Sequence, residues 1–291
     1  MNSYFTLMPD ASEIVAYDAV GIPLYIQTDH LSTYPDMRAL CHWHEDIEFI
    51  RIQKGHMNYF VNGRKILLHE NDCIMINARQ MHYGYSSDRQ ECVFTCILFH
   101  PQLLAENALL HQKYVLPIIQ NSHLEYLFLH EEVAAMDRMV QLKEQALPGY
   151  ELEVIGILHI LWSNLLRRDP FLSASETAMD YSDLTIQKNM VSFINQHYSE
   201  KLALADIAAA GSVCRSKCCS MFKHYLQQSP IDFLNCYRLE VSCRLLKNTN
   251  RPITEIATAC GFNHLSYYSK LFLRNYGCTP SDYRKHSTLI P

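Results

Sequence analysis

Two segments in the second half of this 291-residue chain share one pattern: a short helix with an Ile-Ala pair, a turn of small residues, and a longer helix ending near a Phe. The first segment, LADIAAAGSVCRSKCCSMFKHYL, begins at Leu204, and the second, ITEIATACGFNHLSYYSKLFLRNYG, begins at Ile253. Ser229-Pro230 opens a long helix between them, because Ser caps a helix well and Pro suits its first position. The repeat predicts an all-α domain with two helix-turn-helix units. A generic helical bundle, in which the Ile-Ala pairs are only core residues, is the alternative.

The charge of the chain divides near the same place. Residues 1–182 carry 12 Lys and Arg against 23 Asp and Glu, a net charge of −11, whereas residues 183–291 carry 13 against 7, a net charge of +6. A basic domain fits a polyanionic partner, and an acidic domain that the same partner would repel does another job. The polar stretch 169–183 between them predicts a linker at 171–182, which separates domains at 1–170 and 183–291.

The first half has the pattern of short strands. Ile47–Gln53 alternates apolar and polar residues, and His56–Val61 and Lys65–His69 flank an Asn-Gly pair, the strongest short-range signal of a hairpin. Further short strands are expected at Leu24–Thr28, Cys73–Ile76, His82–Tyr85 and Glu91–Phe99. These spacings predict an all-β sandwich or barrel, followed by helices at Val133–Ala146 and Leu152–Arg168.

Composition excludes several classes of protein. With 48% hydrophobic and 19% charged residues, the chain is neither disordered nor collagen-like. No apolar run approaches the roughly 20 residues of a membrane span, so no membrane partner is expected. The eleven cysteines form no CxxC pair, which predicts free thiols in a reducing, cytoplasmic compartment, with a redox sensor as the alternative.

Region 184–286 resembles the C-terminal DNA-binding domain of AraC/XylS-type transcription regulators. The matching residues are Ile207-Ala208, Phe222-Lys223, Ser229-Pro230, Arg238-Leu239, Leu245-Leu246, Ile253, Ile256-Ala257, Gly261-Phe262, Tyr267–Lys270, Phe272, Thr279-Pro280 and Tyr283-Arg284. The resemblance implies two recognition helices in successive major grooves of double-stranded DNA, about 34 Å apart. Homodimerisation and contact with RNA polymerase are further expectations.

The resemblance also assigns residues to the DNA interface. The first recognition helix is expected to present Arg215, Ser216, Cys219 and Ser220, and the second His264, Leu265, Ser266, Ser269 and Lys270. Arg, Lys and His address guanine acceptors, whereas Ser serves several bases. Phosphate contacts or solvated charges are expected at Lys217, Lys223, Arg238 and Arg274, and burial at Cys218, Phe222, Tyr268 and Phe272.

The first half resembles the cupin-like sensor domain common in this family. The residues that carry the resemblance are His42-x-His44-x3-Glu48-x6-Gly55, followed by Asp72 and His82. It implies an effector site at His42, His44, Glu48 and His82 with Tyr59, and the same three His and Glu form a possible ligand set for Fe, Ni, Zn or Mn. Three interpretations stay open: a divalent metal site, a polar pocket that requires no cofactor, and a satisfied core cluster. The pattern's remaining Gly, Gly, Pro and Gly are replaced by Asp36, Asn71, Asn77 and Arg79.

Together these observations predict a sequence-specific regulator of transcription whose cupin-like barrel senses a small molecule, such as a carbohydrate, and controls promoter binding. The chain is not expected to be an enzyme; a metal-dependent cupin enzyme fused to a DNA-binding domain and a DNA binder without a ligand are the alternatives. The helices at 133–168 are expected to form a homodimer, chiefly Leu152–Arg168. Its interface residues would be Ile155, Leu158, Leu161, Trp162 and Leu165. Packing of this helix only on its own barrel is the other interpretation.

Overall fold

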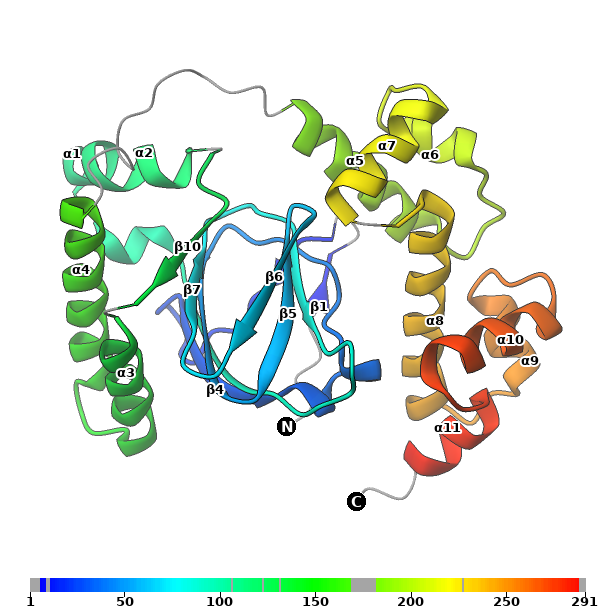
Figure 1. Ribbon diagram of the computed structural model, residues 1–291, viewed down its shortest axis with the longest axis horizontal. Coiled ribbons are helices and arrows are strands. Elements are labelled where there is room, and N and C mark those ends of the chain that lie inside the picture. Colours follow the sequence, from blue (N-terminus) through cyan, green and yellow to red (C-terminus); the bar gives the residue numbers. More distant parts are fainter. Residues whose placement is uncertain are drawn as a thin grey trace. The chain divides into compact units, whose positions relative to one another are not determined.

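The computed structural model describes residues 6–8, 11–105, 107–121, 123–130, 132–168, 182–226 and 228–287. The chain forms two compact units, one that includes Ser12–Tyr181 and one that includes Ser182–Pro291 (Figure 1). The first is rich in strands and the second is helical, which confirms the predicted fold class. The linker predicted at 171–182 lies, apart from Ser182, outside the described residues.

Two antiparallel sheets build the first unit. The five-stranded sheet has the order β10-β7-β4-β9-β3 and the three-stranded sheet the order β6-β5-β8. The strands are β3 (Leu24–His30), β4 (Ile47–Lys54), β5 (His56–Val61), β6 (Arg64–His69), β7 (Cys73–Ile76), β8 (His82–Tyr85), β9 (Val93–Phe99) and β10 (Tyr126–Leu129). A short pair, β1 (Thr6–Leu7) and β2 (Glu13–Ile14), precedes them. The predicted hairpin turns at Asn62-Gly63, where both residues have positive φ.

Successive side chains of β4 point to opposite faces of the larger sheet, and both faces receive apolar side chains. Ile47 and Phe49 point into a core shared with helices α3 (Val133–Gln145) and α4 (Tyr150–Arg168), which cover that side of the unit (Figure 1). Ile50 and Ile52 point to the opposite face, into a core shared with the smaller sheet. The sheet is therefore buried on both sides, and Glu48, between these residues, is only 5% exposed. The short helices α1 (Ala108–Leu110) and α2 (Leu116–Ile119) complete the unit and were not indicated by the sequence patterns.

Four of the five residues predicted for a homodimer interface on α4 are instead core residues of the unit itself, and the fifth, Ile155, is half-buried. Leu158, Leu161, Trp162 and Leu165 are at most 5% exposed and pack with α3 and the larger sheet. The assignment of these side chains to a dimer interface is therefore wrong. Apolar residues spaced by three and four form the same stripe whether a helix packs on its own barrel or on a partner. The exposed apolar side chains of α4 are Leu152 and Ile160, at 75% and 63%.

This packing predicts a stability difference within α4. Leu158→Ala is expected to lower the free energy of unfolding by about 2–5 kcal/mol, because it opens a cavity in the core. Leu152→Ala should change it by no more than about 0.5 kcal/mol, because Leu152 is exposed. Both tryptophans, Trp43 and Trp162, belong to this unit, so urea denaturation followed by tryptophan fluorescence reports on it. Equal effects of the two substitutions would contradict the packing.

The described residues of the second unit form seven helices. They are α5 (Ser182–His197), α6 (Leu204–Ala210), α7 (Arg215–Leu226), α8 (Pro230–Asn248), α9 (Ile253–Ala259), α10 (Leu265–Tyr276) and α11 (Pro280–Ser287). Pairs α6-α7 and α9-α10 are the two predicted helix-turn-helix units, and α8 runs between them (Figure 1). Ser229 caps α8 as expected, accepting a hydrogen bond from the backbone of Asp232. The predicted core residues Cys218, Phe222, Tyr268 and Phe272 are each 0% exposed.

The turns of the two helix-turn-helix units have the same backbone hydrogen bond. In the first, the backbone N–H of Val213 donates to Ala208 at 3.0 Å, and in the second Phe262 donates to Ala257 at 3.0 Å. The residue before each donor has positive φ, +54° at Ser212 and +81° at Gly261. The repeat seen in the sequence is therefore a repeat of backbone geometry. In the described ranges, none of the helices combines the length and the apolar character that a bilayer crossing requires.

Candidate functional site

A cavity of about 560 Å³ opens in the first unit, between the two sheets and the N-terminal segment. Its lining includes aromatic and aliphatic side chains together with four carboxylates. The residues are Glu13, Ile14, Val15, Ala16, Asp18, Tyr25, Gln27, Asp29, Leu31, Tyr34, Ala39, His42, Glu48, Ile50, Met57, Tyr59, Gly84, Phe94, Cys96 and Leu98. Three of the five residues predicted for an effector site, His42, Glu48 and Tyr59, line this cavity.

The other two predicted residues meet these at one wall. His42, His44 and His82 are buried, and their ligand atoms lie within 4.8 Å of one another. Glu48 comes from β4 of the larger sheet, and His82 begins β8 of the smaller sheet. The His-x-His pair lies in a segment before β4 that makes isolated bridges, including one from His42 to His82. The four side chains converge.

Backbone carbonyls orient all three imidazole rings. The Nδ1 atoms of His42, His44 and His82 lie 2.7, 3.0 and 2.9 Å from the carbonyl oxygens of Leu40, Asp46 and Gln80. A carbonyl oxygen only accepts, so in the neutral ring Nδ1 carries the hydrogen and Nε2 keeps its lone pair. Burial lowers the pKa of His42 well below its ordinary value, and His82 and His44 lower it further. The opposite ring nitrogens of His82 and His44, Nε2, face the carboxylate of Glu48.

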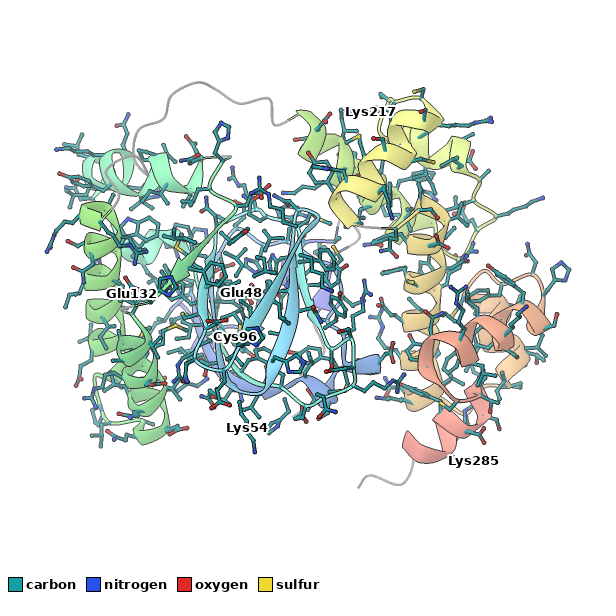
Figure 2. The ribbon with its side chains drawn as sticks, in the orientation of Figure 1. Glu48, Lys54, Cys96, Glu132, Lys217 and Lys285 are labelled. Carbon is teal, nitrogen blue, oxygen red and sulfur yellow. The ribbon has the colours of Figure 1, made fainter. Side chains whose placement is uncertain are left out.

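Glu48 is the carboxylate that these nitrogens face. The hydroxyl of Tyr59 donates to its Oε2 at 2.9 Å and the thiol of Cys96 to its Oε1 at 3.3 Å. The Nε2 atoms of His82 and His44 lie 2.9 and 4.0 Å from Oε2. Burial raises the pKa of Glu48, but the three imidazoles outweigh burial and leave the pKa below the ordinary value. Figure 2 shows Glu48 and Cys96 in the interior of the β-rich unit.

Glu13 is a second carboxylate at the cluster, and sequence reasoning missed it. Its Oε2 lies 3.4 Å from Nε2 of His42. Its backbone N–H donates a hydrogen bond to the carbonyl oxygen of Trp43, the residue between His42 and His44. Burial, then Glu48 and Asp46, raise its pKa to about 8. No motif surrounds Glu13, and only the fold brings its strand β2 to this wall. Asp72 of the cupin pattern is not in the cluster: it accepts a hydrogen bond from the backbone of His69 in a turn.

The second unit displays most of the predicted DNA-facing residues. Arg215, Ser216, Lys217, Ser220 and Lys223 of α7 are exposed, as are His264, Leu265, Ser266, Lys270 and Arg274 at the start of α10 and along it. Cys219 and Ser269 are half-buried. A hollow of about 570 Å³ lies between the two helices over α8, with Cys219, Lys223 and Arg274 in its lining. Basic side chains of both helix-turn-helix units thus border one concave surface.

Two cations have partners within the protein. Lys217 pairs with Asp183 of α5 at 2.8 Å. Arg238 was expected at the surface, but it is 9% exposed and donates to the carbonyl oxygens of Tyr198 and Glu200, both at 2.7 Å. The expectation of a phosphate contact at Arg238 is wrong, because this guanidinium satisfies carbonyls beyond the end of α5. The charge pattern alone does not distinguish this role from a contact with DNA.

Each of the two units contains a segment that matches a known protein family. The AraC-like ligand binding domain model matches residues 31–158, and a helix-turn-helix domain model matches residues 207–286. An uncharacterized HTH-type transcriptional regulator, YdeC of Bacillus subtilis, is 30% identical over 97% of this chain and 98% of its own length. The HTH-type transcriptional activator RhaS of Salmonella arizonae is 23% identical over 86% of this chain and 89% of its own.

Among solved structures, the chain is similar to ToxT of Vibrio cholerae, crystallised with a bound unsaturated fatty acid. The two sequences are 16% identical, the match covers 90% of this chain and 94% of the ToxT chain, and the TM-score is 0.45. The two family models fall on the unit that holds the cavity and on the unit that holds the two helix-turn-helix motifs. With a relative that matches almost the whole length, the assignment is settled: the chain belongs to the AraC family of helix-turn-helix transcription regulators.

Proposed function

We propose that this regulator binds a small-molecule effector in the 560 Å³ cavity of its first unit, and that the effector controls promoter binding by the second. The observation that carries the proposal is the position of His42, Glu48 and Tyr59. They form one wall of a cavity inside the segment that matches the ligand-binding model. A cavity of this size with a few convergent polar groups is the usual form of a small-molecule site.

The lining favours a neutral, polyhydroxylated effector such as a carbohydrate. Asp18, Asp29 and Glu48 supply acceptors, and Glu13, whose pKa is raised to about 8, supplies a carboxyl group that can also donate. None of the described residues that line the cavity is Lys or Arg. Hydroxyl groups donate hydrogen bonds to carboxylates, whereas the carboxylate of an anionic effector would be repelled by them. Aromatic rings at Tyr25, Tyr34 and Tyr59 offer apolar surface beside these acceptors.

A comparison of two Glu substitutions tests this effector site. Glu48→Gln keeps the size of a cavity-lining side chain and removes its charge, whereas Glu45→Gln alters an exposed residue paired with Arg79. A carbohydrate panel is screened for compounds that raise the melting temperature of the wild-type chain and change its affinity for a promoter fragment. We expect Glu48→Gln to lose the response and Glu45→Gln to keep it. Equal responses in both variants, or no response of the wild-type chain, would contradict the proposal.

For the DNA interface, we propose base contacts from the residues that the structure leaves exposed. These are Arg215, Ser216, Ser220, His264, Leu265, Ser266 and Lys270, with Cys219 and Ser269 at the edge of the buried surface. Lys223 and Arg274 border the hollow between the helices and suit phosphate contacts. Lys217 would exchange its pairing with Asp183 for a phosphate.

The convergent His residues support a second candidate role, a divalent metal site. Three imidazole nitrogens and a carboxylate are ligands that Zn, Fe, Ni and Mn accept. Since the named relatives regulate transcription, we propose that a metal here serves effector recognition, and that the enzyme alternative does not apply.

We further propose that the chain acts in the cytoplasm as a homodimer that contacts RNA polymerase. All eleven cysteines are free, as in a reducing compartment. For the dimer, α4 offers a face other than the one first predicted. Leu152 and Ile160 are exposed two turns apart, and Gly156 between them has open space around it, so a partner helix can approach closely.

The exposed face of α4 at Leu152 and Ile160 leads to a prediction about dimerisation. Leu152→Lys combined with Ile160→Lys is expected to convert the dimer to a monomer, because two desolvated charges would oppose each other across the two-fold axis. Leu67→Lys on β6 is the matched control, since Leu67 is also exposed, at 47%. Sedimentation velocity of the full-length variants at micromolar concentration measures the outcome. A double variant that stays dimeric would place the interface elsewhere.

A further inference from the structure

We infer that Cys219 and Cys236 are a peroxide-sensitive pair in the helical unit, and that their oxidation to a disulfide releases the protein from DNA. Both cysteines line the hollow of about 570 Å³ over α8, Cys219 from α7 and Cys236 from α8 itself. The inference rests on the proposed DNA interface of α7 and α10. It adds a site of covalent modification to that interface.

The first support is the register of α7 and α8, which are consecutive helices in contact with each other (Figure 1). The rings of Phe222 and Phe233 pack across this contact, with their centroids 5.7 Å apart. Cys219 lies three residues before Phe222, and Cys236 lies three residues after Phe233. Residues three apart share one face of a helix. Both cysteines therefore lie about one turn from the ring pair, on the side away from the connection between the helices.

The second support is the contrast with the buried cysteines of the same unit. Cys218, Cys243 and Cys260 are each 0% exposed, and burial raises the pKa of their thiols to about 11, 12 and 11. Since the thiolate is the reactive form of cysteine, these three thiols are inert near neutral pH. Cys219 and Cys236 are only half-buried and border a hollow, where a small oxidant reaches them.

The third support is the charge of the hollow. Lys223, one turn after Cys219 on α7, and Arg274 of α10 line it together with the two cysteines. The carboxylate of Asp232 is also in the lining, and it accepts a hydrogen bond from the hydroxyl of Ser229 at 2.6 Å. Reactive cysteines in proteins typically occupy such partly exposed places beside Lys or Arg.

Oxidation by hydrogen peroxide proceeds in two steps. Peroxide oxidises the thiol of Cys219 to a sulfenic acid and releases one water. The thiol of Cys236 then attacks this sulfur, the sulfur–sulfur bond forms, and the sulfenic oxygen leaves as a second water. Two thiols are thereby oxidised and one peroxide is reduced. Transient disulfides of this kind are the usual form of cytosolic redox sensing.

The disulfide affects DNA binding through the first recognition helix. A disulfide holds the two Cα atoms about 4.4–6.8 Å apart, so it ties α7 to α8 at the level of the hollow. The side chain of Cys219, which is among those proposed to face the bases, turns away from the groove. The bond also fixes the tilt of α7 relative to α10, whereas two helices in successive major grooves must be about 34 Å apart.

Peptide mapping of the full-length protein tests the bond. The reduced chain is treated with hydrogen peroxide, the remaining thiols are blocked, and the protein is digested with trypsin without reduction. Trypsin releases Cys219 in residues 218–223 and Cys236 in residues 224–238, and we expect these peptides to be joined. Because Cys218 shares the first peptide, Cys219→Ser is digested in parallel and should lack the link. No joined peptides in the wild type, or the same link in Cys219→Ser, would overturn the inference.

Fluorescence anisotropy tests the effect on DNA. Each protein is measured reduced, oxidised and re-reduced with dithiothreitol, on a genomic fragment that the reduced wild type retains. We expect oxidation to weaken binding by the wild type about 10-fold or more, the effect of a lost base contact, and dithiothreitol to restore it. Cys236→Ser should lose this response to peroxide. Cys278→Ser, at another half-buried cysteine of the unit, should keep it.

Equal responses of Cys236→Ser and the wild type would show that Cys219 is oxidised alone, and would overturn the pair. Unchanged affinity of the cross-linked wild type would overturn the release from DNA. Circular dichroism confirms that each variant is folded, and an unfolded Cys219→Ser leaves Cys236→Ser to decide the mapping. If the reduced wild type retains no genomic fragment, the proposed DNA interface fails and the release from DNA with it, whereas the mapping still decides whether the bond forms.

Discussion

Gly261→Ala is expected to lower the free energy of unfolding of the helical unit by about 2–4 kcal/mol, an effect that combines backbone strain with overpacking. A Cβ at this position would lie 2.5 Å from the carbonyl oxygen of Tyr198 and 2.9 Å from Nε and Nη2 of Arg238. The backbone there has φ +81°, which side chains other than Gly adopt at a cost. Neither Tyr198 nor Arg238 is free to move, since the buried guanidinium donates to that same carbonyl.

Ser212 provides the matched control, because it occupies the corresponding place in the first helix-turn-helix unit. Ser212 has φ +54° and already carries a Cβ. Positive φ at this place in the turn is therefore compatible with a side chain. Ser212→Gly is expected to stabilise the unit by no more than about 1 kcal/mol. Both tryptophans lie in the other unit, so urea denaturation is followed by circular dichroism at 222 nm. If Gly261→Ala costs less than about 1 kcal/mol, the close packing of Gly261, Tyr198 and Arg238 is not as described.

The second large effect is on DNA affinity. Arg215→Ala combined with Lys270→Ala removes one exposed cation from each recognition helix and is expected to weaken specific binding by about 2–6 kcal/mol, since each base contact contributes about 1–3. The control is Lys201→Ala, which removes an exposed charge between α5 and α6. Fluorescence anisotropy at fixed salt measures each affinity. A loss in the double variant no larger than twice that of the control would show that these side chains act only through charge.

The salt dependence separates base contacts from phosphate contacts. Log affinity falls with log salt by about 0.9 for each phosphate neutralised. Lys223→Ala and Arg274→Ala, which border the hollow between α7 and α10, should therefore each reduce the slope by about one. Lys270→Ala should lower affinity for the specific site more than for unrelated DNA and relax the preference at one base pair.

Local sequence patterns predicted most of the helices and strands, because the conformation of these segments follows from neighbouring residues. The hairpin turns at Asn62-Gly63 as predicted, and the strands His56–Val61, Cys73–Ile76 and His82–Tyr85 have the predicted bounds. Strand β10 and the bridged segment that carries His42 and His44 were not predicted, since their conformation depends on pairing with distant strands rather than on alternation.

Positions where the cupin pattern has Gly show how a backbone conformation persists without its usual residue. Asp36, Asn71 and Arg79 have φ of +55°, +72° and +67°. Asn tolerates this region, whereas Arg79 adopts it at a cost. Asn77 replaces the Pro, and its amide donates to the carbonyls of Ile118 and Leu124, an interaction that Pro lacks. Asp36, Asn71 and Arg79 therefore keep the positive φ that Gly favours, although the residue has changed.

The candidate site was only partly predictable. The four cupin-pattern residues converge because the segment before β4 carries His42 and His44 and bridges to His82 at the start of β8, while Glu48 lies on β4. Glu13 depends on a two-residue strand whose pairing no periodicity reveals. The two interpretations that were wrong, Arg238 at the DNA and Leu158 at a dimer interface, share one cause. Charge and helical spacing identify residues that need a partner, but the tertiary structure decides which partner satisfies them.

The most direct test of the account is the set of genomic fragments that the full-length protein retains, compared with the set retained by the Arg215→Ala, Lys270→Ala variant. We expect a small set of enriched fragments for the wild type. They should share a motif with two conserved segments about 10 base pairs apart, as two recognition helices in successive major grooves require, and the variant should lose them. Enrichment of the same fragments by the variant, or uniform retention of all fragments by the wild type, would contradict it.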